Sequence, residues 1–286
     1  MSAQARRIGL GFSYNGRHPS LFAEIAPFVD YVEVTPDSIA TTDGGQARIV
    51  PDALAELRDI ASAVEVVVHG VGLSIGSHDA MSQRYIRLLD EILEQIPARW
   101  HSEHLGYVNV DGANLGTMVA VPRTSEALEL IVERVVWILD RYGIPFLLEN
   151  VVHVLPERSP ELDDAAFLNR LVSETGCGIL LDAYNLECDA HNNGFDSEAF
   201  LQELDLSAVR EVHVAGGVAH DEFLLDIHSR PVAQSTIDLA RDVLSTADSV
   251  DLVTFELLDE AIPMWGEETI ARELGRLRHA LVDAQE

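Results

Sequence analysis

Six apolar segments of the sequence carry a histidine or a carboxylate at or close to their ends. These residues are His69 in VVVHG, His104 in HSEHLG, Glu149 in FLLEN, Asp182 in ILLDA, His213 in EVHVAG and Glu256 in VTFELL. Three neutral imidazoles and three carboxylates that meet in one place make a net negative site. Without a cation, repulsion between the carboxylates would keep some of them protonated. A metal ion removes that conflict, and mixed nitrogen and oxygen ligands suit Fe, Mn, Zn or Co better than Mg or Ca.

The number of candidate ligands indicates more than one ion. Six residues exceed the roughly three or four protein ligands of a single catalytic ion, so we expect two ions with a carboxylate such as Glu149 between them. Taken singly, a strand histidine is more often a hydrogen-bonded core residue, and a buried glutamate often pairs with arginine. The repetition at six strand ends favours the metal. Asp226 and His228 lie two residues apart on an extended segment and can face the same side, where they would hold an additional ion.

The segments that carry these residues alternate with helical patterns along the chain. We expect strands at 8–12, 31–35, 64–70, 100–105, 145–150, 178–183, 209–215 and 252–258. Apolar residues recur at helical spacing in 81–97 and 125–139, and helical stretches follow Pro51, Asp163, Asp196, Val232 and Glu267. Strands and helices alternating over 286 residues predict one domain, residues 1–286, folded as a (β/α)8 TIM barrel of the xylose-isomerase-like type. A doubly wound sheet is the alternative, but its usual GxGxxG turn is missing.

Three connections between these elements are long and polar. Residues 106–123 are expected to form a small hairpin, and residues 184–195 and 216–231 are expected to be loops rich in His, Asn and Asp. All three follow strands, so on a barrel they lie at the C-terminal face, where active sites are built. His78, His101, His153 and His220 are expected at the surface or around the site.

The charge of the chain limits its partners. The formal net charge is -29, from 48 acidic and 19 basic residues, and no Lys/Arg cluster is present. Such a surface repels phosphate backbones and argues against nucleic acid as a partner, whereas a basic peptide or protein is compatible with it. No apolar run approaches the ~18 residues of a membrane span, the N-terminus has no signal-peptide pattern, and only two cysteines occur. We therefore expect a cytoplasmic protein with no membrane contact.

Several ordered motifs resemble those of the DUF692 family, the multinuclear non-haem iron-dependent oxidative enzymes (MNIO). The matching segments are HGVGLSIGS (69–77), SEHLGY (102–107), LLEN (147–150), GCGILLDAYN (176–185), NNGFD (192–196), EVHVAGG (211–217) and DIHSRPV (226–232). The resemblance runs from about residue 7 to residue 265. It implies a TIM barrel with two or three iron ions at its mouth, in a mixed-valent Fe(II)/Fe(III) state, with O2 as co-substrate. It also implies a ribosomally made precursor peptide as substrate, often modified at cysteine, and a partner protein that recognises the leader peptide.

The resemblance also implies a role for each candidate residue. An iron pair would be held by His69, His104, Glu149, Asp182, His213 and Glu256. An additional iron site would take Asn185, Asp226 and His228. Contacts to the substrate are expected from Glu33, Asn150, Tyr184 and Arg230.

This chain departs from the family pattern in three places. It reads LLDAYN where the family usually reads LLDVNN, so Tyr184 replaces an asparagine. It reads NNGFD where the family usually reads NHGFD, so Asn193 replaces a histidine for which His191 is the nearest substitute. It reads VEVTPDS in place of the more frequent EVHPEN, which keeps Glu33 but loses a histidine.

Two other functions fit the same residues. A sugar isomerase or epimerase of the xylose-isomerase-like barrel type would use two divalent ions held by strand-end carboxylates, and it would need neither iron nor O2. A metal-binding partner subunit without catalytic activity is compatible with the exchange at Asn193.

Overall fold

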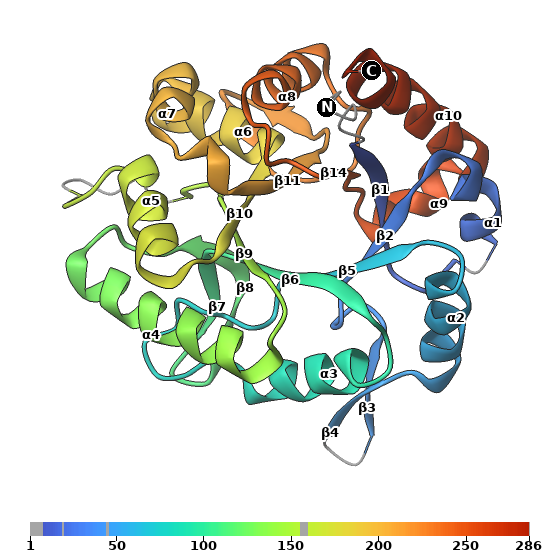
Figure 1. Cartoon of the computed structure of the whole chain (residues 1–286), viewed down its shortest axis with the longest axis horizontal. Coiled ribbons are helices and arrows are strands. Elements are labelled where there is room, and N and C mark those ends of the chain that lie inside the picture. The colour runs from blue at the N-terminus through green and yellow to red at the C-terminus, as the bar shows by residue number, and fades with distance from the viewer. Residues whose placement is uncertain (1–7, 19, 44–45, 155–159, 286) are drawn as a thin grey trace, which may run out of the picture.

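Eight parallel strands close into a barrel with helices around the outside (Figure 1). The computed structural model describes residues 8–18, 20–43, 46–154 and 160–285. Around the barrel the strands follow the order β1-β14-β11-β10-β9-β6-β5-β2. They are β1 (Gly9–Tyr14), β2 (Tyr31–Val34), β5 (Glu65–Gly70), β6 (Ala98–His104), β9 (Phe146–Glu149), β10 (Gly178–Asp182), β11 (Val209–Val214) and β14 (Leu252–Phe255). Each predicted strand is present, so the predicted (β/α)8 barrel is confirmed.

Eight of the described helices connect or follow the strands in the order expected of a barrel. They are α1 (Leu21–Ile25), α2 (Pro51–Ala61), α3 (Gln83–Leu93), α4 (Ser125–Tyr142), α5 (Asp164–Thr175), α7 (Ser197–Glu203), α8 (Gln234–Thr246) and α10 (Glu267–Leu277). The longest, α4, begins where the Thr124 side chain accepts a hydrogen bond from the Ala127 N–H, and it ends at Gly143 in the left-handed conformation. No helix among the described residues is long and apolar enough to cross a membrane.

Strand alternation places polar side chains inside the barrel. In β5, Val66 and Val68 pack outward with the helices, whereas Val67 belongs to a separate inner cluster. This inner cluster consists of Tyr31, Val67, Trp100, Leu147, Leu180 and Leu252. Because side chains alternate along a strand, residues two positions further on also face the interior, nearer the carboxyl ends. Those residues are Glu33, His69, Ser102, Glu149, Asp182 and Thr254, and all are buried.

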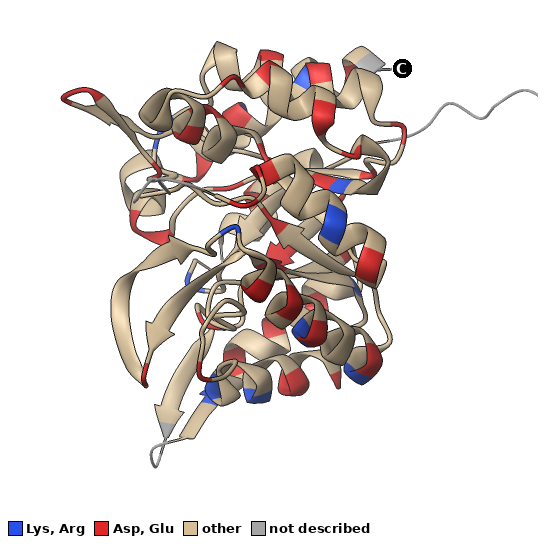
Figure 2. Ribbon diagram, turned by 90° about the vertical axis from the view of Figure 1, so that its left-hand side faces the viewer, with Lys and Arg blue, Asp and Glu red and all other residues tan. Residues whose placement is uncertain are grey.

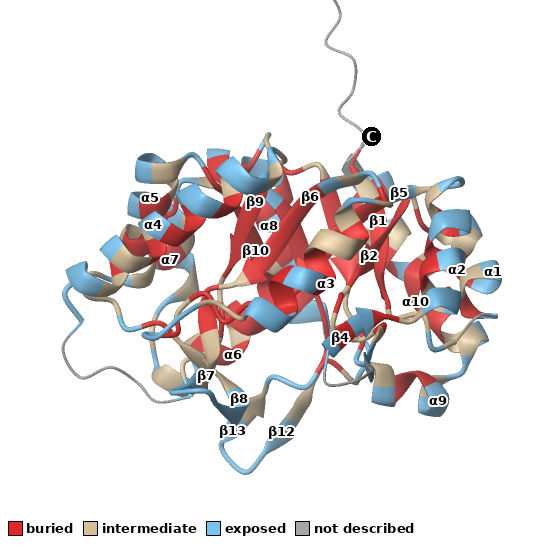
Figure 3. Ribbon diagram, turned by 90° about the horizontal axis from the view of Figure 1, so that it is seen from below, coloured by how far each residue is buried: buried red, intermediate tan, exposed pale blue. Residues whose placement is uncertain are grey.

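Hairpins project from the strand connections at the carboxyl ends. Strands β7 (Gly106–Val110) and β8 (Ala113–Ala120) form the hairpin predicted at 106–123. Strands β12 (Val218–His220) and β13 (Phe223–Leu225) form a second hairpin inside the predicted polar connection at 216–231. Both lie on the same side of the barrel as α6 (Ala183–Asn193), as Figure 3 shows. A third hairpin, β3 (Ala40–Asp43) with β4 (Gln46–Ile49), was not predicted.

Helix α6 corrects the prediction of a polar loop at 184–195, which was wrong. It begins directly after β10, where the Asp182 side chain accepts a 2.6 Å hydrogen bond from the Asn185 N–H, and it ends at Gly194, with φ of 73°. Asn185, Asp189 and Asn193 recur every four residues and therefore share one face of the helix. The composition suggested a loop, but this face carries the polar residues inward, and Asn185 and Asp189 are buried. A short helix, α9 (Ile262–Trp265), precedes α10.

Candidate metal centre

His69, His104 and Glu149 form the first group of candidate ligands at the mouth of the barrel. Glu149 Oε2 lies 3.1 Å from His69 Nε2 and 3.4 Å from His104 Nε2. The other ring nitrogens have partners of their own, since His69 Nδ1 is 3.0 Å from Ser102 Oγ and His104 Nδ1 is 2.9 Å from the Gly70 carbonyl oxygen. Both histidines therefore turn Nε2 toward the glutamate, and one ligand atom from each of the three residues lies within 4.8 Å of the others.

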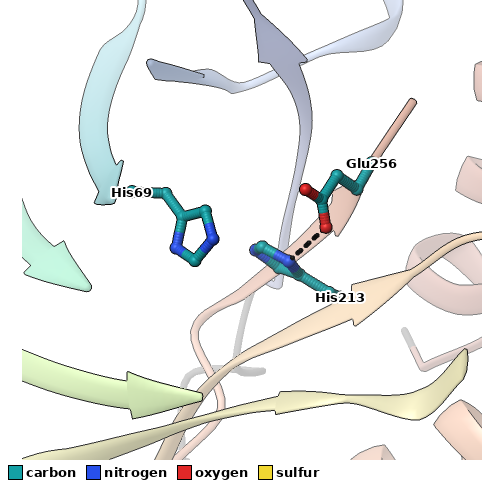
Figure 4. A group of neighbouring side chains, drawn as sticks. All are labelled: His69, His213 and Glu256. Atoms are coloured by element: carbon teal, nitrogen blue, oxygen red, sulfur yellow. Dashed lines mark hydrogen bonds and ion pairs between the residues drawn. The ribbon is translucent and has the colours of Figure 1, made fainter. Parts of the chain in front are cut away.

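Glu149, Asp182, His213 and Glu256 form the second group. Their ligand atoms also lie within 4.8 Å of one another. His213 Nδ1 is 3.1 Å from Glu256 Oε2 and 4.0 Å from Asp182 Oδ2. In Figure 4, His69, His213 and Glu256 converge from different strands, and the two imidazole rings lie 5.2 Å apart. Glu149 belongs to both groups, which is the position expected of a carboxylate between two ions.

The residues predicted for an additional ion adjoin the second group. His228 Nδ1 is 3.0 Å from Glu256 Oε2, and its Nε2 is 2.8 Å from Asp226 Oδ1 and 3.9 Å from Asp182 Oδ2. Asn185 Nδ2 donates a 3.2 Å hydrogen bond to Glu149 Oε1. The structure thus brings the nine predicted ligands to one mouth, with Asp226 the most exposed of them.

Five buried ligand atoms at this mouth make no hydrogen bond, although three of them, His69 Nε2, Glu149 Oε2 and His228 Nε2, lie 2.8–3.1 Å from an oppositely charged or ionisable neighbour. They are His69 Nε2, Glu149 Oε2, Asp182 Oδ2, Asn185 Oδ1 and His228 Nε2. Buried polar atoms are nearly always hydrogen-bonded, because an unsatisfied one costs about 1–3 kcal/mol. All five belong to predicted ligands and are nitrogen or carboxylate and amide oxygen atoms. The donor set therefore fits a transition-metal ion, which would satisfy these atoms together.

The carboxylates around His69, His213 and His228 raise the pKa values of these histidines. Burial lowers the pKa of His69, but Glu33 and Glu149 outweigh that effect and raise it to about 9. Burial likewise opposes protonation of His213 and His228, yet their carboxylate neighbours raise both pKa values well above the ordinary range. For Asp182, burial together with Glu149 raises the pKa to about 7. Protons on the imidazoles supply the charge that a bound cation would supply, so metal binding should release protons.

Three of the four predicted substrate contacts are engaged within the protein. Glu33 is 1% exposed and its Oε2 lies 2.9 Å from His213 Nε2. Asn150 donates to the Asp182 carbonyl oxygen and accepts from the Asp182 N–H, which holds the end of β10. Tyr184 donates a 3.1 Å hydrogen bond to the Leu225 carbonyl oxygen of the β12–β13 hairpin. Arg230 is exposed on the rim.

Helix α6, which follows β10, does not place His191 at the centre. His191 Nε2 lies 3.0 Å from the Glu222 carbonyl oxygen in an exposed position. Asn193 instead donates to the His153 carbonyl oxygen and to Asp189. His153 Nδ1 lies 2.7 Å from Asp189 Oδ2, so the imidazole beside Asn193 comes from the segment after β9. The contact between His153 and Asp189 was not predicted from the sequence. The only signal was the four-residue spacing of Asn185, Asp189 and Asn193 on α6, which marks the face that carries Asp189.

His101 also differs from expectation, because it is neither at the surface nor at the centre. It is 1% exposed, on the side of β6 that faces the helices, and its Nε2 lies 3.2 Å from the Tyr85 hydroxyl. Burial lowers the pKa of His101 to about 3. This histidine is a neutral core residue. From the sequence alone, we could not tell which face of β6 points into the barrel and which faces the helices, because both faces carry polar residues.

Fold and site together define a (β/α)8 barrel with a histidine–carboxylate centre at its C-terminal mouth. The sequence model of the family described as "RiPP precursor modification enzyme MbnB/TglH/ChrH" matches residues 7–281, so the chain belongs to this family, the MNIO or DUF692 family. Relatives include the UPF0276 protein of Anaeromyxobacter sp. (strain Fw109-5), 33% identical over 84% of this chain and 82% of the relative. A UPF0276 protein of Bordetella pertussis is 32% identical over 85% and 83% of the two chains.

Solved structures support the fold. A putative xylose isomerase from Rhodospirillum rubrum superposes with a TM-score of 0.61 and 15% identity, over 96% of this chain and 99% of that one. D-psicose 3-epimerase from Clostridium cellulolyticum H10 superposes with a TM-score of 0.58 and 12% identity, over 97% and 98% of the two chains. These likenesses confirm a barrel of the xylose-isomerase-like type and, at such identities, show the fold alone.

Proposed function

We propose that the protein is a multinuclear non-haem iron, O2-dependent oxidase that modifies a ribosomally made peptide, with cysteine as the residue modified. The observation that carries the proposal is the pair of buried histidine–carboxylate groups that share Glu149, with five ligand atoms that make no hydrogen bond, in a chain of this family. His69, His104 and Glu149 would hold one iron, and Glu149, Asp182, His213 and Glu256 the second. Asn185, Asp226 and His228 would hold a third.

The chain prepares these ligands by fixing their orientation. Bound iron would supply O2 reduction and the Lewis acidity that favours a substrate thiolate. Ser102 and the Gly70 carbonyl oxygen engage Nδ1 of His69 and His104, which leaves Nε2 of each for metal. Asn185 binds Oε1 of Glu149 and so keeps Oε2 directed at the two histidines. Buried ligands held by such contacts limit reorganisation during the reaction.

The substrate has an approach to the centre between the two rim hairpins. A cavity of about 710 Å³ reaches from His104 and Asp226 past β8 and β13 to the solvent. Its walls include the exposed apolar side chains of Val71, Val154, Phe223 and Ile227. Apolar walls that lead to a polar end suit a peptide segment with an apolar flank and a ligating side chain. The acidic residues distributed over the molecule in Figure 2 would favour a basic leader peptide or a basic partner protein that recognises it.

The test is oxidation of a defined peptide. Anaerobically purified protein is loaded with Fe(II), mixed with the Cys-containing precursor peptide and the partner protein encoded by neighbouring genes, and exposed to O2. We expect O2 uptake and a change in peptide mass that both require iron. An unchanged peptide mass with fully loaded protein would overturn the proposal.

Two parallel reactions separate the alternatives. Turnover of a ketohexose by Mn-loaded protein without O2 would identify a sugar epimerase. Tight iron binding without O2 uptake on any peptide would identify a metal-binding partner subunit. The same assays with Glu149→Gln serve as the metal-depleted control, since Glu149 belongs to both ligand groups.

A further inference from the structure

We propose that Glu33 is a positioning residue that holds His213 in the tautomer presenting Nδ1 to the metal; this inference rests on the proposed metal centre. Glu33 Oε2 lies 2.9 Å from His213 Nε2, the ring nitrogen other than the one that faces Glu256. His213 Nδ1 faces Glu256 Oε2 at 3.1 Å. Glu33 and His213 are 1% and 0% exposed, so water does not compete for this contact.

The three strand histidines differ in the atom that engages the ring nitrogen away from the centre. At His69 it is a hydroxyl, Ser102 Oγ, and at His104 it is the Gly70 carbonyl oxygen. At His213 it is a carboxylate, and the nitrogen it engages is Nε2 where the other two rings use Nδ1. A carboxylate that accepts the N–H of a ligating imidazole fixes the ring and raises its basicity toward metal. We therefore expect His213 to bind through the opposite nitrogen from His69 and His104.

A second buried carboxylate, Glu211, lies below His213 and is held by other donors. Glu211 Oε1 accepts from the Tyr31 hydroxyl at 3.1 Å and from Thr254 Oγ1 at 2.5 Å, and Oε2 accepts from Trp100 Nε1 at 2.8 Å. Its nearest oxygen is 3.7 Å from His213 Nε2, further than Glu33. With both oxygens of Glu211 bonded, Glu33 is the carboxylate left to accept the imidazole proton.

The same geometry argues against a separate ion between these residues. Glu33, Glu211 and His213 lie close enough together to hold one. However, three donors already occupy the Glu211 oxygens, and such an ion would need the lone pair of His213 Nε2, which then could not donate to Glu33. Glu33 Oε1 makes no hydrogen bond, but with the Glu211 oxygens occupied a metal at this depth would have too few open ligand atoms, so the contacts favour the supporting hydrogen bond.

Co²⁺ alone is the probe for this inference, because its d–d absorption reports ligand geometry without substrate or O2. We expect Glu33→Gln to weaken the Co²⁺ site that contains His213 by about 10–100-fold and to change its absorption bands. Glu273→Gln is the control: Glu273 on α10 is a buried carboxylate outside the ligand groups that accepts from the Val232 N–H and pairs with Arg276, and this variant should bind Co²⁺ as the wild type does. Thermal unfolding of the metal-free variants checks that both fold.

A measurement on the wild type keeps the test independent of any variant. In Zn²⁺-loaded, ¹⁵N-histidine-labelled protein, long-range ¹H–¹⁵N spectra should show metal on Nδ1 of His213 and on Nε2 of His69 and His104. Metal on Nε2 of His213, or unchanged Co²⁺ affinity and spectrum in Glu33→Gln, would overturn the role of Glu33 while leaving the proposed oxidase intact. A wild-type chain that takes up no Co²⁺ would overturn both.

Discussion

Glu149 is the residue on which the proposed centre depends most. It is fully buried at the end of β9, one oxygen faces His69 and His104, and the other accepts from Asn185. An isolated carboxylate at such depth would be protonated, and burial does oppose its charge, but His104 and His69 outweigh burial and lower the pKa of Glu149. The carboxylate is thus kept ionised by the residues with which it would share a metal.

Replacing Glu149 should therefore weaken metal binding by both ligand groups. We expect Glu149→Gln, loaded anaerobically with Fe(II) and desalted, to retain less than about half of the iron of the wild type, since both ligand groups lose a charged oxygen. Metal per chain is measured by mass spectrometry of the digested protein, with Glu273→Gln as the variant expected to load normally. Wild-type iron content in Glu149→Gln would contradict a shared ligand.

His101 makes a prediction about acid stability. Burial lowers the pKa of His101 from 6.5 to about 3, so as the pH falls below 6.5 the unfolded chain takes up a proton that the folded chain refuses. Between pH 7 and pH 5 this should remove about 2 kcal/mol from the free energy of unfolding. The loss should be absent in His101→Phe, which keeps an aromatic ring beside Phe146 and Tyr85.

The comparison is made by urea unfolding of the metal-free proteins at both pH values. His101→Phe forfeits the hydrogen bond with the Tyr85 hydroxyl at every pH, a cost of about 1 kcal/mol, so the difference between pH values is the informative quantity. Equal pH dependence in the two proteins would show that His101 does not titrate in this way.

At the scale of elements, what could be predicted followed from strand periodicity. Every predicted strand is present because apolar runs such as VVVH pack on both faces of the barrel wall, and the period of two carried His69, Glu149 and Asp182 to one mouth. The secondary structure of residues 184–195 could not be predicted from periodicity. Their polar composition suggests a loop, but an N-cap at Asp182 and the packing of Asn185 against Glu149 make a helix.

The partners of the histidine ring nitrogens and the role proposed for Glu33 could not be predicted from the sequence either. Each depends on which atom of a neighbouring strand lies opposite, and strand register across the barrel fixes that. β1 and β14 are paired neighbours although they lie at opposite ends of the chain. The register of the paired strands β5 and β6 likewise sets two partners: Ser102 of β6 lies beside His69, and the Gly70 carbonyl oxygen of β5 lies beside His104.

The packing of β1 against β2 leads to a prediction for Gly11 in β1. A Cβ on Gly11 would overlap the ring of Tyr31, which crosses the barrel interior to reach Glu211. We expect Gly11→Ala to lower the free energy of unfolding by about 1–3 kcal/mol, because the ring must move and its hydrogen bonds weaken. Gly275→Ala in α10 is the control: its nearest contact is a Phe28 ring atom at 3.3 Å, and the change should stay within about 1 kcal/mol. Equal effects of the two substitutions in urea unfolding would contradict the argument.

For the whole molecule, the dominant property is the excess of negative charge. Figure 2 shows Asp and Glu residues spread over the helices and loops, while ion pairs such as Arg141 with Asp90 and Arg278 with Asp30 neutralise some of them. A net charge of -29 repels itself more strongly in the compact fold than in an expanded chain. The cations proposed for the barrel mouth would relieve part of this repulsion where Glu149, Asp182 and Glu256 lie close together.

Screening should therefore stabilise the metal-free protein. Raising NaCl from about 20 to about 300 mM shortens the Debye length from roughly 20 Å to below 10 Å, and we expect the melting temperature at pH 7.5 to rise by roughly 2–4 °C, equivalent to about 1 kcal/mol in a chain of this size. The same series at pH 5, closer to the pI of about 4.5, provides the control, because fewer carboxylates are ionised and the increment should shrink. A salt increment that is equal at both pH values would mean that general salt effects on apolar burial, and not the charge of this molecule, set the change.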